Sequence, residues 1–304
     1  TIAVTDSKIT GTGTTQITIN PSTRLAGNTS YYLHIAATAF DDITGNSYAG
    51  ISNATTLNFT TTANGCTVNG AQQSGAISLA NLNTAIATGT DDVRACNTSS
   101  ITNMSNLFKD KTSFNQDISS WNTSNVTNMT YMFKNATAFN QDISDWNVGE
   151  VTNMSYMFHG ATSFNNGGVA LDWSDTGSLT NTTYQFYTSP FNQDVSSWDM
   201  SNVTSMYLMF YYARQFNNGG VALDWTNLRN VTNMQYVFYS ASAFNQDIST
   251  WDVSGATHMH YFLSSSAFSR ANYDKLLVAW DQLTLQNNVT FEAANIKYTS
   301  GTPA

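Results

Sequence analysis

Charged side chains are scarce in this sequence. Asp, Glu, Lys and Arg make up only 10% of its 304 residues, against about a quarter in ordinary globular proteins. The acids outnumber Lys and Arg by 20 to 11, which gives a net charge of -9. Nucleic-acid binding needs a basic surface, so this function class is excluded. Ser, Thr and Asn replace the charges and predict a fold rich in side-chain hydrogen bonds.

Long apolar runs are also missing. No stretch approaches the roughly 18 apolar residues that a membrane-spanning helix requires, so we expect no membrane insertion. No secretory signal precedes the first residues, which already have the pattern of a strand. We therefore expect a module that is monomeric and belongs to a longer chain.

Only two cysteines are present, Cys66 and Cys96. They allow a single pairing, which would close a loop of about 30 residues and contribute roughly 3 to 4 kcal/mol. The composition is typical of extracellular proteins, in which disulfides persist, so the bridge is the favoured interpretation. Two buried free thiols are the alternative.

Residues 1–63 carry the period-two alternation of β-strands. The alternating segments are 14–20, 30–36 and 55–61, and clusters of Gly, Asn and Asp separate them. This pattern predicts an antiparallel all-β unit. It supplies fewer strands than the roughly seven of a complete sandwich, so we expect a partial one.

From residue 101 the sequence repeats itself every 24 to 28 residues. The units begin at Ile101, Val126, Val151, Leu179, Val203, Val231 and Ala256. A tryptophan recurs late in the units, as Trp121, Trp146, Trp173, Trp198, Trp225 and Trp251. So short a unit cannot bury its own apolar face, whereas stacked units share a continuous core. The period predicts an α/β, leucine-rich-repeat-like solenoid of about seven coils over residues 101–267.

Within each unit the apolar residues predict a helix followed by a short strand. In the second unit the helical stripe consists of Met129, Met132, Phe133, Ala136 and Phe139. Thr127 is the expected N-cap and Asn140 the expected end. The strand follows over 141–146, with Trp146 pointing inward and the residue before it pointing outward. Ile118, in the first unit, is three residues before Trp121, so in a plain strand it would point to the opposite face from Trp121.

The repeats are bounded on both sides. Residues 64–100 are predicted to form a linker and an N-terminal cap. Residues 268–304 break the repeat, and Leu276, Leu277 and Trp280 indicate a capping helix, which the end of a solenoid needs.

The segment FNQDISSWNTSNVTNMTYMF (114–133) and its repeats resemble a bacterial leucine-rich-repeat-like surface-protein family. That family is classed as a domain of unknown function and is abundant in mycoplasma lipoproteins. The resemblance covers about residues 101–281. The segment ANYDKLLVAW (271–280) is similar to the start of the family's usual tail, which here is expected to be truncated.

The segment 25–52, with its DDITGN motif, resembles the second half of a bacterial immunoglobulin-like domain. Together the two resemblances imply a module of a large adhesin that is extracellular and sits on the bacterial cell surface. Asp41, Asp42 and Asn46 offer the hard oxygen ligands that Ca²⁺ prefers, so calcium is a possible cofactor. A turn rich in Asp and Asn between strands is the alternative.

Nothing in the sequence supports catalysis, and we expect no enzyme. The four histidines are His34, His159, His258 and His260. None has a cysteine partner, and no nucleophile elbow, phosphate loop or zinc-ligand spacing is present. His258 and His260 are two residues apart, so a helix would point them in different directions.

Three polar columns recur in the units and are interpreted as structural. Aspartates that cap turns are expected at Asp117, Asp142, Asp194 and Asp247, with a cation site as the alternative. Asparagines that satisfy turn amides are expected at Asn115, Asn140, Asn165, Asn192, Asn217 and Asn245. Threonines that cap helices are expected at Thr127, Thr152, Thr180, Thr204, Thr232 and Thr257.

Tyrosines recur at outward positions of the predicted helices. The candidate ligand-binding residues are Tyr184, Tyr187, Tyr211, Tyr212, Tyr236 and Tyr239. An exposed aromatic cluster marks a contact surface, and tyrosine suits both glycans and peptides. Packing of neighbouring helices against one another is the alternative.

The predicted strands offer a rival surface. Aspartates gather around the tryptophans, namely Asp145, Asp172, Asp199, Asp224 and Asp252. Such an acidic strip would favour a basic peptide or a glycan bridged by cations, whereas a solvated polar face needs no ligand.

The expected function is non-catalytic ligand binding by a bacterial adhesin. The partner would be a protein, peptide or glycan on a host or neighbouring cell. A structural spacer without a ligand of its own is the alternative function.

Overall fold

A computed structural model describes residues 9–10, 18–19, 30–32, 58–60 and 65–298. The chain divides into two compact units, Thr1–Gly65 and Cys66–Ala304. In the first unit, β1 (Ile9–Thr10) pairs antiparallel with β2 (Thr18–Ile19), and β3 (Ser30–Tyr32) with β4 (Asn58–Thr60). The strands β2, β3 and β4 fall inside predicted strand segments. Asp41, Asp42 and Asn46, the predicted calcium ligands, lie outside the described residues.

The second unit begins with a small cap. The hairpin of β5 (Thr67–Val68) and β6 (Ala71–Gln72) precedes α1 (Leu79–Thr88). The buried carboxylate of Asp91 accepts hydrogen bonds from the hairpin amides of Asn69 and Gly70, at 2.9 and 2.8 Å. These bonds, first that from Gly70, lower the pKa of Asp91 below its usual value. A disulfide joins Cys66 to Cys96 and ties the start of the cap to its end.

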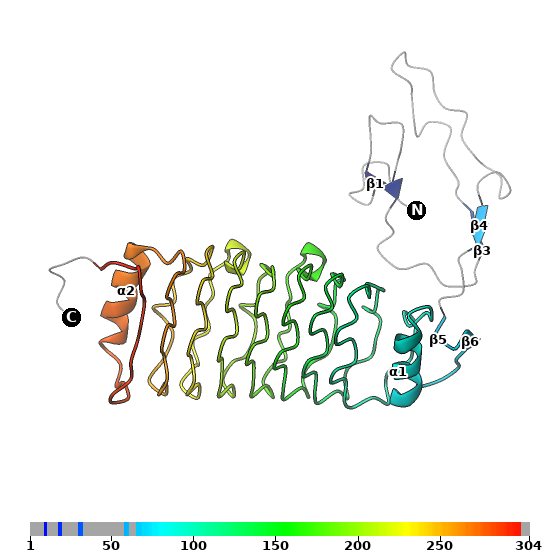
Figure 1. The fold of residues 1–304 in the computed structure, drawn as a ribbon, viewed down its shortest axis with the longest axis horizontal. Coiled ribbons are helices and arrows are strands. Elements are labelled where there is room, and N and C mark those ends of the chain that lie inside the picture. Colours follow the sequence, from blue (N-terminus) through cyan, green and yellow to red (C-terminus); the bar gives the residue numbers. More distant parts are fainter. Residues whose placement is uncertain (1–8, 11–17, 20–29, 33–57, 61–64, 299–304) are drawn as a thin grey trace, which may run out of the picture. The chain divides into compact units, whose positions relative to one another are not determined.

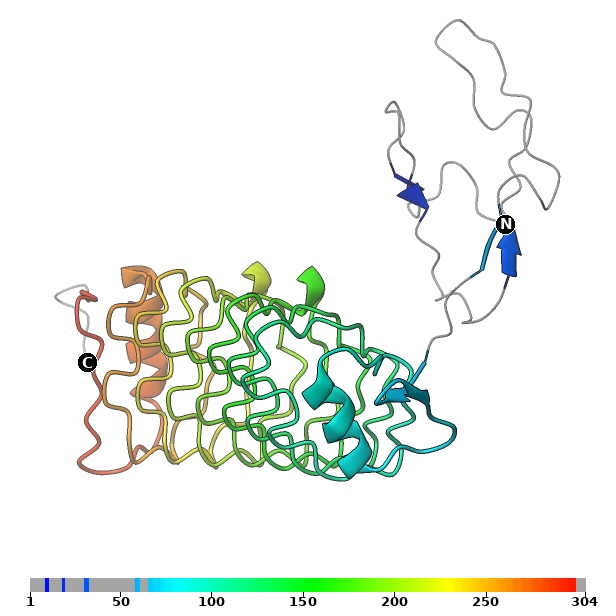
Figure 2. The same cartoon turned by 45° about the vertical axis from the view of Figure 1, so that its right-hand side comes forward.

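Coils stacked in sequence order follow the cap. Figure 1 shows them side by side, and Figure 2 shows α1 at one end of the row and α2 at the other. Parallel bridges join each coil to the next through one residue per coil: Asn103, Asn128, Asn153, Asn181, Ser205, Asn233 and His258. The classification as a leucine-rich-repeat-like solenoid stays a prediction.

The predicted helix inside each unit is wrong. Residues 101–267, all of which the structure describes, contain no α-helix. Alternate amides donate to the next coil, as in Met129 to Asn153 (3.0 Å) and Tyr131 to Ser155 (3.0 Å). The amides between them close three-residue turns within their own coil. Apolar residues three apart therefore mark successive turns here, and not the face of a helix.

The predicted strand around each tryptophan is a turn as well. The Trp146 amide donates to the Ile143 carbonyl at 3.1 Å, and the first unit repeats this bond between Trp121 and Ile118. Such a turn points both residues inward, which explains the parity of Ile118. The tryptophans are at most 3% exposed, as predicted. The residues before them are exposed, also as predicted: Ser120, Asp145, Asp172, Ser197, Asp224 and Thr250.

The tryptophans also link the coils. Each indole Nε1 donates to a carbonyl of the preceding coil at 2.8 to 3.1 Å, for example Trp198 to Leu171 and Trp225 to Val195. Beside them, phenylalanine rings stack along the row, with Phe186 and Phe210 at 5.3 Å between ring centroids. Each buried aromatic ring thus packs both within its coil and against its neighbours.

Asparagine side chains form a second ladder, as predicted. The Oδ1 atom of one coil accepts a backbone amide of the next, as in Asn192 to Asn217 at 2.7 Å. The turn-capping aspartates are also confirmed, because Asp142 and Asp194 accept the serine amides two residues later. The threonines do not cap helices. Their hydroxyls donate to the preceding coil instead, as in Thr180 to the Thr152 carbonyl at 2.9 Å.

Two coils are longer than the others by a short insertion. The 3₁₀ turns η1 (Asn166–Gly168) and η2 (Asn218–Gly220) project from one edge of the row in Figure 1. Asn166 and Asn218 are fully buried there, and their Oδ1 atoms accept the amides of Ile143 and Val195 at 2.9 Å. A long coil therefore hydrogen-bonds to its predecessor through an asparagine at the position that Gln occupies in the shorter coils.

The last helix, α2 (Arg270–Trp280), lies where a capping helix is predicted. Ser269 caps it by accepting the amide of Asn272 at 3.2 Å. After the helix the chain returns along the last coil, where Met259 and Phe291 form a parallel bridge. The row thus ends in a helix and a return segment in place of a further repeat.

The asparagine ladder can be tested at Asn192, whose Oδ1 accepts the amides of Asn217 and Gly219 at 2.7 and 3.1 Å. Asn192→Ala leaves both donors without this acceptor and should lower the free energy of unfolding by about 1 to 3 kcal/mol in denaturant titrations. Asn192→Asp keeps an acceptor oxygen and is the matched control, expected to lose less. Equal stability of the alanine variant and the parent would contradict the ladder's role.

The disulfide can be tested separately, since it closes a loop with a sequence separation of 30. Replacing Cys66 and Cys96 together by Ser should lower the free energy of unfolding by about 3 kcal/mol. A reducing agent should cause the same loss in the parent and none in the variant. A parent whose unfolding curve is insensitive to reductant would refute this expectation.

Candidate functional site

The predicted tyrosines form two columns along one face of the coils, which we call the tyrosine face. The first column, at the sixth residue of the units, contains Tyr131, Tyr156, Tyr184, Tyr236 and Tyr261. The second column, three residues later in the units, contains His159, Tyr187, Tyr211 and Tyr239. These side chains are half-buried except that of Tyr261, which is 38% exposed.

An unusual backbone conformation points the first column outward. Tyr156 and Tyr184 have φ of 58°, in the left-handed region that bulky residues rarely adopt. Their amides donate to the next coil, from Tyr156 to Thr183 at 2.8 Å and from Tyr184 to Tyr207 at 2.9 Å. The pairing between coils therefore holds a conformation that would cost an isolated residue about 1 to 2 kcal/mol.

Rings of the two columns stack on their neighbours. In the first column the ring centroids of Tyr156 and Tyr184 lie 4.3 Å apart with planes 11° from parallel. In the second, Tyr187 and Tyr211 are separated by 4.9 Å, and Tyr211 and Tyr239 by 5.1 Å. Neighbouring rings thus cover the faces of the inner rings, and a ligand would meet ring edges and hydroxyls.

Tyr207 completes the first column and was missed by the sequence reasoning. Leu208 occupies the tyrosine position in that coil and is only 6% exposed. The ring of Tyr207, one residue earlier, meets Tyr184 edge-on at 5.4 Å and Tyr236 at 6.3 Å. The swapped order of tyrosine and leucine in this unit is the signal that could have revealed it.

The remaining predicted tyrosine, Tyr212, lies beside the second column. Its ring centroid is 4.7 Å from that of Tyr211 and 5.8 Å from that of Tyr239. The guanidinium of Arg214 lies over its ring at 5.3 Å. The structure therefore brings all six predicted tyrosines into one surface.

The charges beside the tyrosine face are mainly positive. Lys134 lies over the rings of Tyr131 and Tyr156, at 5.4 and 5.6 Å from their centroids, and Lys109 lies 5.8 Å from that of Tyr131. Burial and then nearby Lys134 lower the pKa of His159, so this ring is neutral near pH 7. The face thus offers hydrogen bonds from neutral rings and a few cations at its start.

Burial raises the pKa of four phenols on this face. For Tyr156, Tyr184, Tyr211 and Tyr236 loss of solvent is the largest cause, and neighbouring tyrosines add to it. A raised phenol pKa keeps the hydroxyl protonated, so these groups remain hydrogen-bond donors well into the alkaline range.

The rival acidic strip lies on another part of each coil, around the tryptophans. Asp145, Asp172, Asp199 and Asp224 are exposed and Asp252 is half-buried. Two of the five cap turns, because Asp199 and Asp252 accept the amides of the serines two residues later at 2.9 and 3.0 Å. Arg229 lies 3.8 Å from Asp252. Asp199 and Asp252 therefore contribute to the fold.

His258 and His260 lie beside different side chains. Nδ1 of His258 lies 2.9 Å from the Thr257 hydroxyl, and Nδ1 of His260 lies 3.7 Å from a Glu292 oxygen. Within residues 65–298 and the short described strands, no group of three or more His, Cys, Asp or Glu could hold a metal ion. No helix in that part of the chain is long and apolar enough to cross a membrane.

Two families of known sequences match the chain. Residues 77–189 and 169–280 match the family described as Mycoplasma protein of unknown function, DUF285, and together they span well over half of the chain. Residues 1–61 match the bacterial Ig-like domain, a type of domain typical of bacterial surface proteins. No curated protein and no solved structure matches the chain.

The raised phenol pKa values predict a loss of stability at high pH. In the folded protein these tyrosines have a pKa above the reference value of 10.0. Their protonated hydroxyls therefore add to the stability of the native state at a pH below 10.0. The free energy of unfolding should fall as the pH rises from about 9 to about 11. Denaturant titrations at several pH values, with tyrosinate absorbance followed in parallel, measure this effect.

Replacing Tyr184 and Tyr211 by Phe keeps two rings and removes two ionisable groups. The double variant should lose less stability at high pH than the parent. Tyr298→Phe, outside the tyrosine face, is the matched control. Identical alkaline profiles for the double variant and the parent would show that these phenols are not the cause.

Proposed function

The chain belongs to the family described as Mycoplasma protein of unknown function, DUF285, and we propose that it is a non-catalytic ligand-binding module of a bacterial cell-surface adhesin. The match of residues 1–61 to a bacterial Ig-like domain supports the surface location. The partner is a protein, peptide or glycan on a host or neighbouring cell. The module acts as a monomer within a longer surface protein.

The observation that carries this proposal is the continuity of the tyrosine face. Aromatic rings follow one another from Tyr131 to Tyr261 without a gap, because Tyr207 replaces the missing ring at Leu208. The coil does not require aromatic residues there. The first coil has Asn106 and Lys109 at the same two positions and makes the same bonds to its neighbour.

The geometry of the face favours one mode of binding. Stacked neighbours at 4.3 to 5.1 Å cover both faces of inner rings such as Tyr156 and Tyr211, so a sugar ring has no free face to stack on there. Phenol hydroxyls and ring edges remain, and they recur once per coil at about the 4.8 Å spacing of paired strands. An extended peptide or polysaccharide lying along the row would make several such contacts at once.

A structural spacer is the second candidate function. It is favoured by the ladders that cross every coil junction, such as the tryptophan bonds of 2.8 to 3.1 Å. A rod of this kind resists bending without any ligand, and stacking of the tyrosines would then serve stability alone. The acidic strip is a rival binding surface, and it suits a basic peptide.

Glycan and peptide arrays probed with the soluble protein separate these functions. A binding module should bind a defined set of spots, and a spacer should bind none. For any spot that is bound, Tyr211→Ala with Tyr239→Ala should abolish binding, and Tyr211→Phe with Tyr239→Phe should weaken it about tenfold, because hydroxyl hydrogen bonds are lost while the rings remain.

The matched control is Asp145→Asn with Asp224→Asn on the acidic strip. This variant should bind like the parent if the tyrosine face is the site. Loss of binding in the aspartate variant, with the tyrosine variants unaffected, would move the site to the acidic strip. Thermal unfolding of each variant shows whether the fold is retained, and the phenylalanine pair is expected to keep it.

A further inference from the structure

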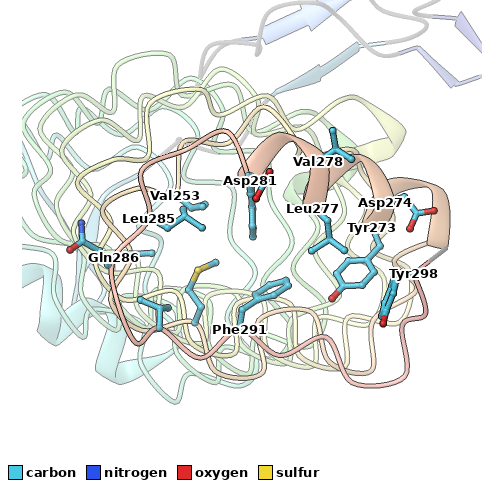
Figure 3. Close-up of a pocket in the computed structure, with 14 residues that line it drawn as sticks. Val253, Tyr273, Asp274, Leu277, Val278, Asp281, Leu285, Gln286, Phe291 and Tyr298 are labelled. Atoms are coloured by element: carbon cyan, nitrogen blue, oxygen red, sulfur yellow. The ribbon is translucent and has the colours of Figure 1, made fainter. Parts of the chain in front are cut away.

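The end of the coil row beside α2 contains a hollow of about 510 Å³. In Figure 3, Val253 and Leu285 lie on one side of it, Leu277 and Tyr273 on the other, and Phe291 below. Its size is within the range of about 300 to 1,000 Å³ that small-molecule sites occupy. It is formed by the last coil, α2, the loop after α2 and the return segment, and none of the tyrosines of the tyrosine face lines it.

Exposed apolar side chains gather around this hollow. Val278 is 52% exposed, Leu285 47% and Tyr298 61%, and all three line it. Leaving apolar area in water costs about 25 cal/mol per Å². A concentration of such area around a concave surface is typical of a binding site.

The hollow coincides with a break in the tryptophan ladder. Trp251 still donates its indole N–H to the Leu223 carbonyl at 3.0 Å. Trp280 lines the hollow and is only 6% exposed, yet within the described part of the chain its Nε1 has no hydrogen-bond partner. The ladder of indole hydrogen bonds therefore ends at Trp251.

The charge around the hollow is negative. Asp274 and Asp281 line it, and no Lys, Arg or His of the described residues does so. Asp281 is also the C-cap of α2, whose last turn contains no basic residue. The dipole at a helix C-terminus favours a positive charge, so an acid there raises the preference for a cation.

We propose that this hollow binds a small hydrophobic ammonium compound, with its apolar body among Leu277, Leu285 and Phe291 and its charged group toward Asp281. The site goes beyond the proposed adhesin function and is independent of the tyrosine face.

Three probes that share one apolar body test the proposal: phenylbutylamine, phenylbutanol and phenylbutyrate. Isothermal titration calorimetry on the whole chain should show binding of the amine, binding of the alcohol about tenfold weaker, and binding of the carboxylate weaker still. Added salt should weaken the binding of the amine more than that of the alcohol, because only the amine interacts through its charge. Equal affinity for all three probes, or no binding of the amine, would overturn the proposal.

Two variants locate the site. Asp281→Asn should weaken binding of the amine about tenfold and leave binding of the alcohol unchanged. Leu285→Trp fills the hollow from an exposed position and should abolish binding of both. Asp224→Asn, a carboxylate on the acidic strip, is the matched control and should change nothing.

Circular dichroism and thermal unfolding show that each variant is folded. Amine binding that survives Leu285→Trp would overturn the proposal, because the amine would then bind elsewhere. Sedimentation of the parent detects the other possible occupant, a second copy of the chain. A dimer that dissociates in Leu285→Trp would show that the hollow is an interface between copies, and would also overturn it.

Discussion

The pairing of backbone amides between coils is the constraint from which the rest of the structure follows. In each coil alternate amides, such as those of Met129 and Tyr131, donate to the next coil, and the amides between them close turns within the coil. No single coil can satisfy this pattern alone, because half of the donors need a neighbour. The same pattern holds Tyr131, Tyr156 and Tyr184 in left-handed backbone at φ of 58 to 60°. The position of the tyrosine face is thus a consequence of the hydrogen bonding between coils.

The side-chain ladders extend the same principle to the interior and the edges. Indole, amide and hydroxyl groups at fixed positions each reach the adjacent coil, as in Trp198 to Leu171, Asn192 to Asn217 and Thr180 to Thr152. Such a side chain has a hydrogen-bond partner only where an adjacent coil is present. Both ends therefore need a different solution. The first end has a helix, a hairpin held by Asp91 and a disulfide, whereas the last end has α2 and an incompletely filled hollow.

The sequence predicted the identity of the buried residues more accurately than the backbone conformation that buries them. Met129, Phe133 and Trp146 recur at constant places in the period, so their inward orientation could be inferred, and they are at most 3% exposed. The helix could not be excluded, because residues three apart lie on one face both in a helix and in successive turns. Ile118 was the one residue whose spacing argued against a strand. The stacking of the tyrosine rings, the replacement of Leu208 by Tyr207 and the hollow beside α2 depend on distances between coils, which no pattern within one unit contains.

The two candidate sites differ in what their surroundings leave available to a ligand. On the tyrosine face each inner ring is already covered by its neighbours at 4.3 to 5.1 Å, so contacts must come from hydroxyls and edges and must be spread over several coils. At the hollow α2 and the return segment take the place of a further coil, and apolar side chains such as Leu277 and Phe291 line an unfilled space. An extended chain suits the first site because repetition multiplies weak contacts. A small amphiphile suits the second, because a hollow lined by apolar side chains and a carboxylate favours a ligand with an apolar body and a single charge.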